Sequence, residues 1–236
     1  MDAEIFEERI EFASNLGRLE GILAYPADAT PDACVLLLSP HPHLGGNMEN
    51  NVIRHLARDC AQLGLASLRF NYHGVGGSTM HDATGVSLRE YWWDIERTRD
   101  YARLLPDVEA AYNALRACLP KARETAVIGY SLGSVVMGLA AHLFPEATAI
   151  AIAPPVDRVT LNGFDRFRRA TIVVTGDQDF CFDETAFQRF YNALIGPKHH
   201  LRFQDSDHFY RKREAELFRA LAPFLKNARG VAARSA

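Results

Sequence analysis

The stretch TAVIGYSLG, from Thr125 to Gly133, decides the fold of this chain. Its first half is a short apolar run with β-branched side chains, which is typical of a buried strand. The residues that follow, Ser134–Phe144, are long enough for a helix and end at Pro145. The G-x-S-x-G string therefore falls where a strand turns sharply into a helix, which is the context of a nucleophile elbow.

The two glycines of this string have a steric explanation. A Cβ atom at Gly129 or Gly133 would collide with a neighbouring strand or helix in so tight a turn. The turn would expose the Ser131 hydroxyl and place the Leu132 amide at a helix N-terminus, where it can stabilise an oxyanion. The string alone is weak evidence, because glycine and serine are common residues. The rest of the chain must supply a base and an acid.

Outward from the elbow, unbroken apolar runs alternate with amphipathic helices. The expected strands are Cys34–Leu38, Leu65–Phe70, Ala126–Ile128, Ala149–Ala153, Thr171–Val174 and His200–Phe203. The expected helices are Asn50–Leu63, Leu104–Ala117, Leu132–Leu143, Glu184–Ile195 and Phe209–Ala228. This pattern predicts an α/β protein with a mostly parallel, doubly wound sheet. Two alternating runs, Ile5–Ala13 and Arg18–Tyr25, predict an antiparallel hairpin at the N-terminal edge.

Length and composition narrow the class of protein. The chain has 236 residues, of which 48% are apolar, and it holds no repeat or linker-like boundary, so we expect a single domain over 1–236. A net charge of -3 gives no reason to expect nucleic acid or a membrane surface as partner. The N-terminus lacks the apolar core of a signal peptide, and the four widely spaced cysteines suit a reducing compartment. We therefore expect a cytoplasmic protein.

The segment 79–104 fits the alternation poorly and contains both tryptophans, Trp92 and Trp93. Its length suggests a short lid or insertion over the site. The alternative interpretation is an amphipathic helix whose aromatic side chains pack on the sheet. The candidate substrate-binding residues are His43, Tyr130, Trp92 and Trp93.

The acid and the histidine of a hydrolase triad follow the serine along the chain, at the carboxyl ends of later strands. Asp177 and Asp179 both follow the expected strand Thr171–Val174. We favour Asp179, since it can reach back over the sheet, whereas Asp177 is placed to bond turn amides. His208 follows the last expected strand, and of nine histidines it alone combines that place with the required order.

These three residues would divide the chemistry between them. Serine is a poor nucleophile, so His208 must take the proton of Ser131 and later deliver it to the leaving group. Asp179 would fix the tautomer of the imidazole and stabilise the imidazolium. Such a mechanism requires neither a metal nor an organic cofactor, and the expected partner is a small-molecule ester.

A second oxyanion amide is expected from the loop SPHPHLGGN, Ser39–Asn47. Its prolines cannot donate a hydrogen bond, which leaves the amide of His41 or, as the alternative, that of His43. The same two histidines suggest a metal site. No cysteine or carboxylate lies near them in the loop, however, and we predict no metal there.

Five motifs in order carry a resemblance to a known family. They are Pro40-His41-Pro42 with Gly45-Gly46, the stretch RFNYHGVGGS at Arg69–Ser78, the G-x-S-x-G string, Ala153-Pro154-Pro155, and Asp207-His208-Phe209. Over nearly its full length the chain resembles the α/β-hydrolase superfamily. More narrowly, it is similar to small bacterial hydrolases related to dienelactone hydrolases and acyl-peptide-hydrolase domains. The resemblance implies the α/β-hydrolase fold and the same three triad residues.

Two departures from that group concern the surroundings of the triad. Ser39 stands where the group usually has histidine, and the segment from Thr79 to Tyr101 is longer than usual. The sequence predicts a serine hydrolase that cleaves a small carboxylic ester through an acyl-enzyme intermediate. A thioesterase or peptidase of the same fold remains an alternative, because a triad does not distinguish these substrates. The alternative from another class is a catalytically idle protein that binds a ligand.

Overall fold

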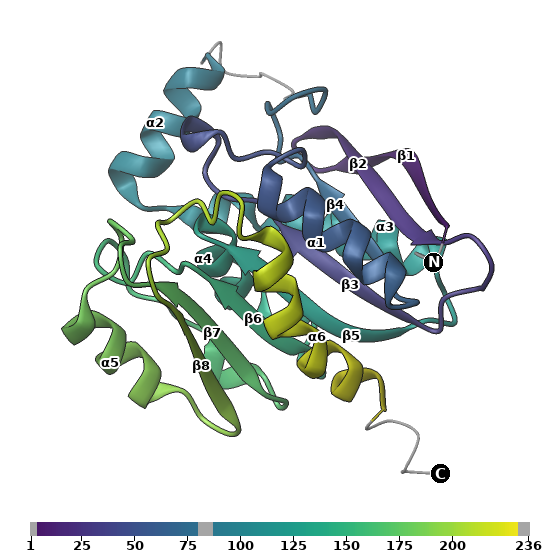
Figure 1. The fold of residues 1–236 in the computed structure, drawn as a ribbon. Helices are drawn as coiled ribbons and strands as arrows, with labels where there is room; N and C mark the ends of the chain where they lie inside the picture. The colour runs from purple at the N-terminus through teal and green to yellow at the C-terminus, as the bar shows by residue number, and fades with distance from the viewer. Residues whose placement is uncertain (1–3, 80–86, 231–236) are drawn as a thin grey trace.

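The computed structural model describes residues 4–79 and 87–230. Within these ranges eight strands form one sheet, in the order β1-β2-β4-β3-β5-β6-β7-β8 (Figure 1). The strands are β1 (Ile5–Ser14), β2 (Gly17–Pro26), β3 (Ala33–Leu38), β4 (Ala66–Phe70), β5 (Arg123–Tyr130), β6 (Thr148–Ile152), β7 (Thr171–Gly176) and β8 (Lys198–Phe203). β2 pairs antiparallel with both β1 and β4, and the pairs from β4 to β8 are parallel. The predicted mostly parallel sheet with an N-terminal hairpin is confirmed.

The central strands are buried on both faces, which explains their unbroken apolar sequence. In β3, Val35 and Leu37 belong to the apolar cluster on one face, whereas Leu36 and Leu38 belong to the cluster on the other. Side chains alternate between the two faces of a strand, so each face receives every second residue.

Helices cover both faces of the sheet. Figure 1 shows α1 (Asn51–Gln62) and α6 (Glu214–Gly230) in front of one face and α3 (Leu105–Cys118) and α4 (Leu132–Leu139) behind the other. The cluster on the second face also contains buried side chains of α2 (Leu88–Thr98) and α5 (Glu184–Ala193).

The helix boundaries follow the sequence closely at α1 and α3, with larger differences at α4 and α6. α4 ends at Leu139, and a short 3-10 turn, Ala141–Leu143, occupies the rest of the predicted helix. Pro145 follows this turn and disfavours helical geometry in the residue before it. α6 was predicted from Phe209 but begins at Glu214, because Tyr210 and Lys212 adopt positive φ angles that do not fit an α-helix.

Within the segment 79–104, the described part contains the helix α2. A capping box between Ser87 and Glu90 begins it, with the Ser87 side chain accepting from the Glu90 amide. Trp92 is 3% exposed and packs in the core, while the next residue, Trp93, is 55% exposed. This matches the amphipathic-helix interpretation for residues 88–98. The part of the predicted lid at 80–86 lies outside the described residues.

None of the helices in the two described ranges combines the length and the apolar content that crossing a membrane requires.

A buried histidine–aspartate pair ties together three parts of the fold. His73, in the loop after β4, and Asp107, in the first turn of α3, are both fully buried. Asp107 Oδ2 lies 2.5 Å from His73 Nδ1 and accepts the His73 amide at 2.8 Å. Its other oxygen accepts the Ser14 hydroxyl of β1 at 2.7 Å. The carboxylate of Asp107 therefore connects the hairpin edge, the loop after β4 and α3.

The acid stability of the fold should depend in part on His200 in β8. Burial lowers the pKa of His200 below its ordinary value, with Arg202 acting in the same direction and Glu184 in the opposite one. The unfolded chain therefore binds a proton at His200 more readily than the folded chain does. The neutral His200 side chain contributes fully to the free energy of unfolding above about pH 6.5, and this contribution is lost as pH falls. We expect His200→Gln to flatten the fall in the free energy of unfolding between about pH 6.5 and 5, measured by urea denaturation.

The exposed residue His142 provides the matched control for this measurement. His142→Gln should retain the slope of the wild type. Equal slopes for wild type and His200→Gln would contradict the assignment.

Candidate active site

The serine of the elbow occupies a strained position at the junction of β5 and α4. Ser131 has a φ angle of 52°, which is unfavourable for a residue with a side chain, and its amide donates to Ile152 O of β6 at 2.8 Å. A Cβ on Gly129 would meet the Gly133 carbonyl, and one on Gly133 would meet the Leu38 carbonyl of β3. The close contact between α4 and the two strands therefore requires both glycines.

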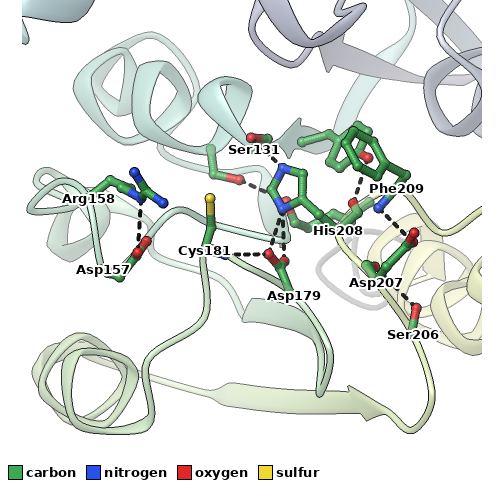
Figure 2. Close-up of polar contacts among 12 residues, drawn as sticks. Ser131, Asp157, Arg158, Asp179, Cys181, Ser206, Asp207, His208 and Phe209 are labelled. Atoms are coloured by element: carbon green, nitrogen blue, oxygen red, sulfur yellow. Dashed lines mark hydrogen bonds and ion pairs between the residues drawn. The ribbon is translucent and has the colours of Figure 1, made fainter.

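Three side chains from separate loops meet at the carboxyl ends of the strands. Ser131 Oγ lies 2.9 Å from His208 Nε2, and His208 Nδ1 lies 2.8 and 2.9 Å from the two oxygens of Asp179 (Figure 2). Ser131 follows β5, Asp179 follows β7 and His208 follows β8. All three are buried, so little bulk water competes with these hydrogen bonds.

The two aspartates after β7 have different environments. Asp179 faces His208 and also accepts the Cys181 amide at 2.7 Å, which fixes the orientation of the carboxylate. Asp177 accepts the Ser206 amide at 3.3 Å and so connects the loops after β7 and β8. The structure thus brings Asp179 to the histidine and places Asp177 among turn amides.

Tyr130 lies beneath the histidine rather than at a surface open to a ligand. It is 1% exposed, and its hydroxyl donates to His208 O at 2.7 Å. The two rings are 5.9 Å apart. This residue was expected to bind substrate, but its contacts make it a support for the loop that carries His208.

The two histidine amides of the loop after β3 differ in their hydrogen bonding. The His43 amide donates to His41 Nδ1 at 3.2 Å, whereas within residues 4–79 and 87–230 the amides of His41 and Leu132 donate to no protein acceptor. Gly45, at φ 74°, and Gly46, packed against the Pro40 carbonyl, close the turn. Of the two sequence candidates in this loop, His41 therefore has the available amide.

The other predicted substrate-binding residues line an open groove of about 650 Å³ beside this loop. His43 and Trp93 are exposed on it, with their ring centroids 5.5 Å apart. Trp92 also contributes to the groove, although most of its indole is buried against His41, Tyr72 and His73. Val75 and Arg89 complete a surface with both apolar and cationic character.

Cys181 is a buried thiol close to Asp179 and His208. Its sulfur, an Asp179 oxygen and a His208 nitrogen lie within 4.8 Å of one another, as the only such metal-sized group among the described residues. Both nitrogens of the His208 ring already face other side chains, Nδ1 that of Asp179 and Nε2 that of Ser131. Burial, with the charge of Asp179 second, raises the pKa of the Cys181 thiol to about 12.

Solved structures share this architecture over almost their full length. A serine hydrolase homologue from Coxiella burnetii is 24% identical, with a TM-score of 0.76 over 93% of this chain and 96% of its own. A serine hydrolase from Xanthomonas campestris, described as lacking a lid, is 23% identical with a TM-score of 0.74 over 94% of each chain. A dienelactone hydrolase from Anabaena variabilis is 17% identical with a TM-score of 0.71, over 94% and 98%.

The chain has the α/β-hydrolase fold. The fold expected from the five motifs is therefore confirmed, and the elbow, Asp179 and His208 occupy the strand ends where this fold gathers catalytic groups. No protein-family model matches this α/β-hydrolase-fold chain. An uncharacterized protein of Rickettsia prowazekii (strain Madrid E) is 27% identical over 227 residues, which cover 92% of this chain and 88% of that protein.

Proposed function

We propose that this protein is a serine hydrolase that cleaves a small carboxylic ester. One observation carries the proposal: a continuous hydrogen-bonded chain runs from Ser131 Oγ through both nitrogens of His208 to Asp179, at 2.9 and 2.8 Å. A strained serine with a buried base and a buried acid has no evident use in a protein that only binds a ligand.

The reaction divides into two proton-balanced halves. Ser131 Oγ forms a bond to the ester carbonyl carbon while His208 Nε2 takes the hydroxyl proton, and the tetrahedral adduct then collapses. The bond to the alcohol oxygen breaks as His208 returns that proton to it, which releases the alcohol and leaves an acyl-enzyme. Water attacks the acyl-enzyme by the same route, and the acid product and free Ser131 result. Asp179 holds Nδ1–H and stabilises the imidazolium formed in each half.

Two backbone amides would stabilise the oxyanion of each tetrahedral adduct. The Leu132 amide opens α4, so the helix N-terminus adds its partial positive charge. The His41 amide faces no protein acceptor within the described ranges, as an oxyanion donor requires. Nucleophile, base and electrostatic stabilisation thus come from the chain itself.

The groove beside the oxyanion loop suggests where the rest of the substrate binds. His43 and Trp93 present exposed rings on it, and Val75 adds apolar surface. Such a surface favours an ester with a small apolar or aromatic group.

A fluorophosphonate probe combined with nitrophenyl esters of graded acyl length tests the proposal. We expect one probe per chain, mapped to the peptide of Ser131 by mass spectrometry, and a nitrophenol burst equal to the enzyme concentration at the start of turnover. Faster turnover of a matched thioester or anilide would assign the alternative substrate class. A chain that neither reacts with the probe nor turns over any of these substrates would be the idle binding protein.

A further inference from the structure

Helix α2 contacts the oxyanion loop, defined here as Pro40–Gly46, through the imidazole of His41. The edge of Trp92 packs on this imidazole, with ring centroids 5.4 Å apart. On the same helix, Glu96 Oε2 lies 3.5 Å from His41 Nε2. The side chain of His41 is 10% exposed and that of Glu96 51%, so a buried ring faces a carboxylate at the surface.

The other nitrogen of His41 supports the backbone of the loop. Nδ1 accepts the His43 amide at 3.2 Å and so caps the short 3-10 turn Pro42–Leu44. An acceptor at Nδ1 has no proton, which places the proton of the neutral imidazole on Nε2. Burial lowers the pKa of His41, an effect that Glu96 opposes and His43 reinforces. The neutral ring is therefore the form present near pH 7.

The Nε2–H group then lacks a close partner. Among the described residues it makes no hydrogen bond, although the atom is buried. The 3.5 Å between His41 Nε2 and Glu96 Oε2 is longer than a typical hydrogen bond. A small movement of α2 or of the Glu96 carboxylate would bring the two atoms within hydrogen-bond distance. Catalytic hydrogen bonds are often long in ligand-free enzymes and shorten when substrate binds.

Glu96 is itself held toward the loop. The Tyr101 hydroxyl donates to Glu96 Oε2 at 3.3 Å from the turn that follows α2. Asp94, on the same helix, accepts Arg103 at 2.8 Å. These contacts fix the C-terminal half of α2 relative to the turn at Tyr101–Leu104.

We propose that Glu96 is a positioning residue for the oxyanion hole. Its carboxylate selects the Nε2–H tautomer of His41, so that Nδ1 caps the turn and the His41 amide stays aimed at the oxyanion. This inference rests on the proposed function, because it assigns Glu96 to the same site. It makes α2 a support of the catalytic loop.

Steady-state kinetics of four variants tests this assignment. Loss of an oxyanion-hole donor lowers kcat by about 100- to 1000-fold. A displaced His41 amide should still donate weakly to the oxyanion, so the decrease in kcat should be smaller than for a lost donor. We therefore expect Glu96→Ala to lower kcat about 10- to 100-fold with little change in KM. Glu96→Gln retains an acceptor for Nε2–H and should restore most of the activity. Tyr101→Phe removes the hydroxyl that holds Glu96 toward the loop, so it should lower kcat by a smaller factor than Glu96→Ala. Arg97→Ala, a truncation at the next position of α2, is the control and should stay within about threefold of wild type.

Nitrogen NMR of the histidine side chains separates this inference from the proposed function. In protein labelled with 15N-histidine, we expect His41 as the Nε2–H tautomer in wild type and in Glu96→Gln, and as a mixture of tautomers in Glu96→Ala. An unchanged His41 tautomer and unchanged kcat in Glu96→Ala would overturn the role of Glu96. A wild type without esterase activity would instead overturn the proposed function, whatever tautomer His41 shows.

Discussion

Ser131→Ala is expected to lower kcat for nitrophenyl esters by about 10⁵- to 10⁶-fold, because alanine cannot form the acyl-enzyme. Alanine keeps the backbone of the elbow, and its methyl group fits the space of the serine side chain. The variant should therefore fold as the wild type does, which circular dichroism can verify. Hydrolysis rates measured with excess enzyme extend the range far enough to detect the residual activity.

Non-additivity provides the control for the Ser131 variant. When two residues act in the same step, removing the second costs little once the first is gone. The double variant Ser131→Ala with His208→Ala should therefore have about the same kcat as Ser131→Ala alone. Asp177→Asn alters the neighbouring carboxylate outside the triad, and its kcat should stay within about tenfold of wild type. Hydrolysis by Ser131→Ala within about tenfold of wild type would mean that another group is the nucleophile.

The second large effect concerns stability. Asp107→Ala is expected to lower the free energy of unfolding by about 3–5 kcal/mol, because it leaves two buried donors and one half-buried donor without their acceptor. These are the His73 amide, the His73 ring and the Ser14 hydroxyl. Urea denaturation followed by tryptophan fluorescence measures the loss.

An exposed ion pair serves as the comparison for Asp107. Glu146 contacts Arg168 at 2.8 Å on the surface, so Glu146→Ala should change stability by no more than about 1 kcal/mol. Asp107→Asn keeps an acceptor and should lose less than Asp107→Ala. A loss below about 1 kcal/mol in Asp107→Ala would show that the loop after β4 relaxes to satisfy His73 in another way.

Local sequence patterns predicted the sheet and the three residues that meet at Ser131. Each of these residues follows an apolar strand, so its place in the chain also fixes its edge of the sheet. Position after a strand does not predict the contact between His73 and Asp107. Their pairing depends on α3 packing beside the loop after β4, and nothing in the sequence near either residue indicates the other.

Helix α2 was one of two interpretations of its segment, and the sequence did not decide between it and a lid. Its charged residues are dense and its aromatic side chains face both the core and solvent, which obscured the helical period around Trp92 and Trp93. The capping box at Ser87 and Glu90 was a usable signal for its start. The start of α6 was wrong because a turn with positive φ angles at Tyr210 and Lys212 precedes it, and no glycine there marks this turn.

The order of the strands along the chain determines when the site is complete during folding. Ser131, Asp179 and His208 are spread over 78 positions of sequence and depend on strands β5 to β8, of which β8 forms the far edge of the sheet. A nascent chain or a fragment that ends before Lys198 contains the elbow but lacks His208, the residue proposed as the base. Ester turnover would then appear only when the last strand has docked, so the recovery of activity during refolding would report the final step of assembly.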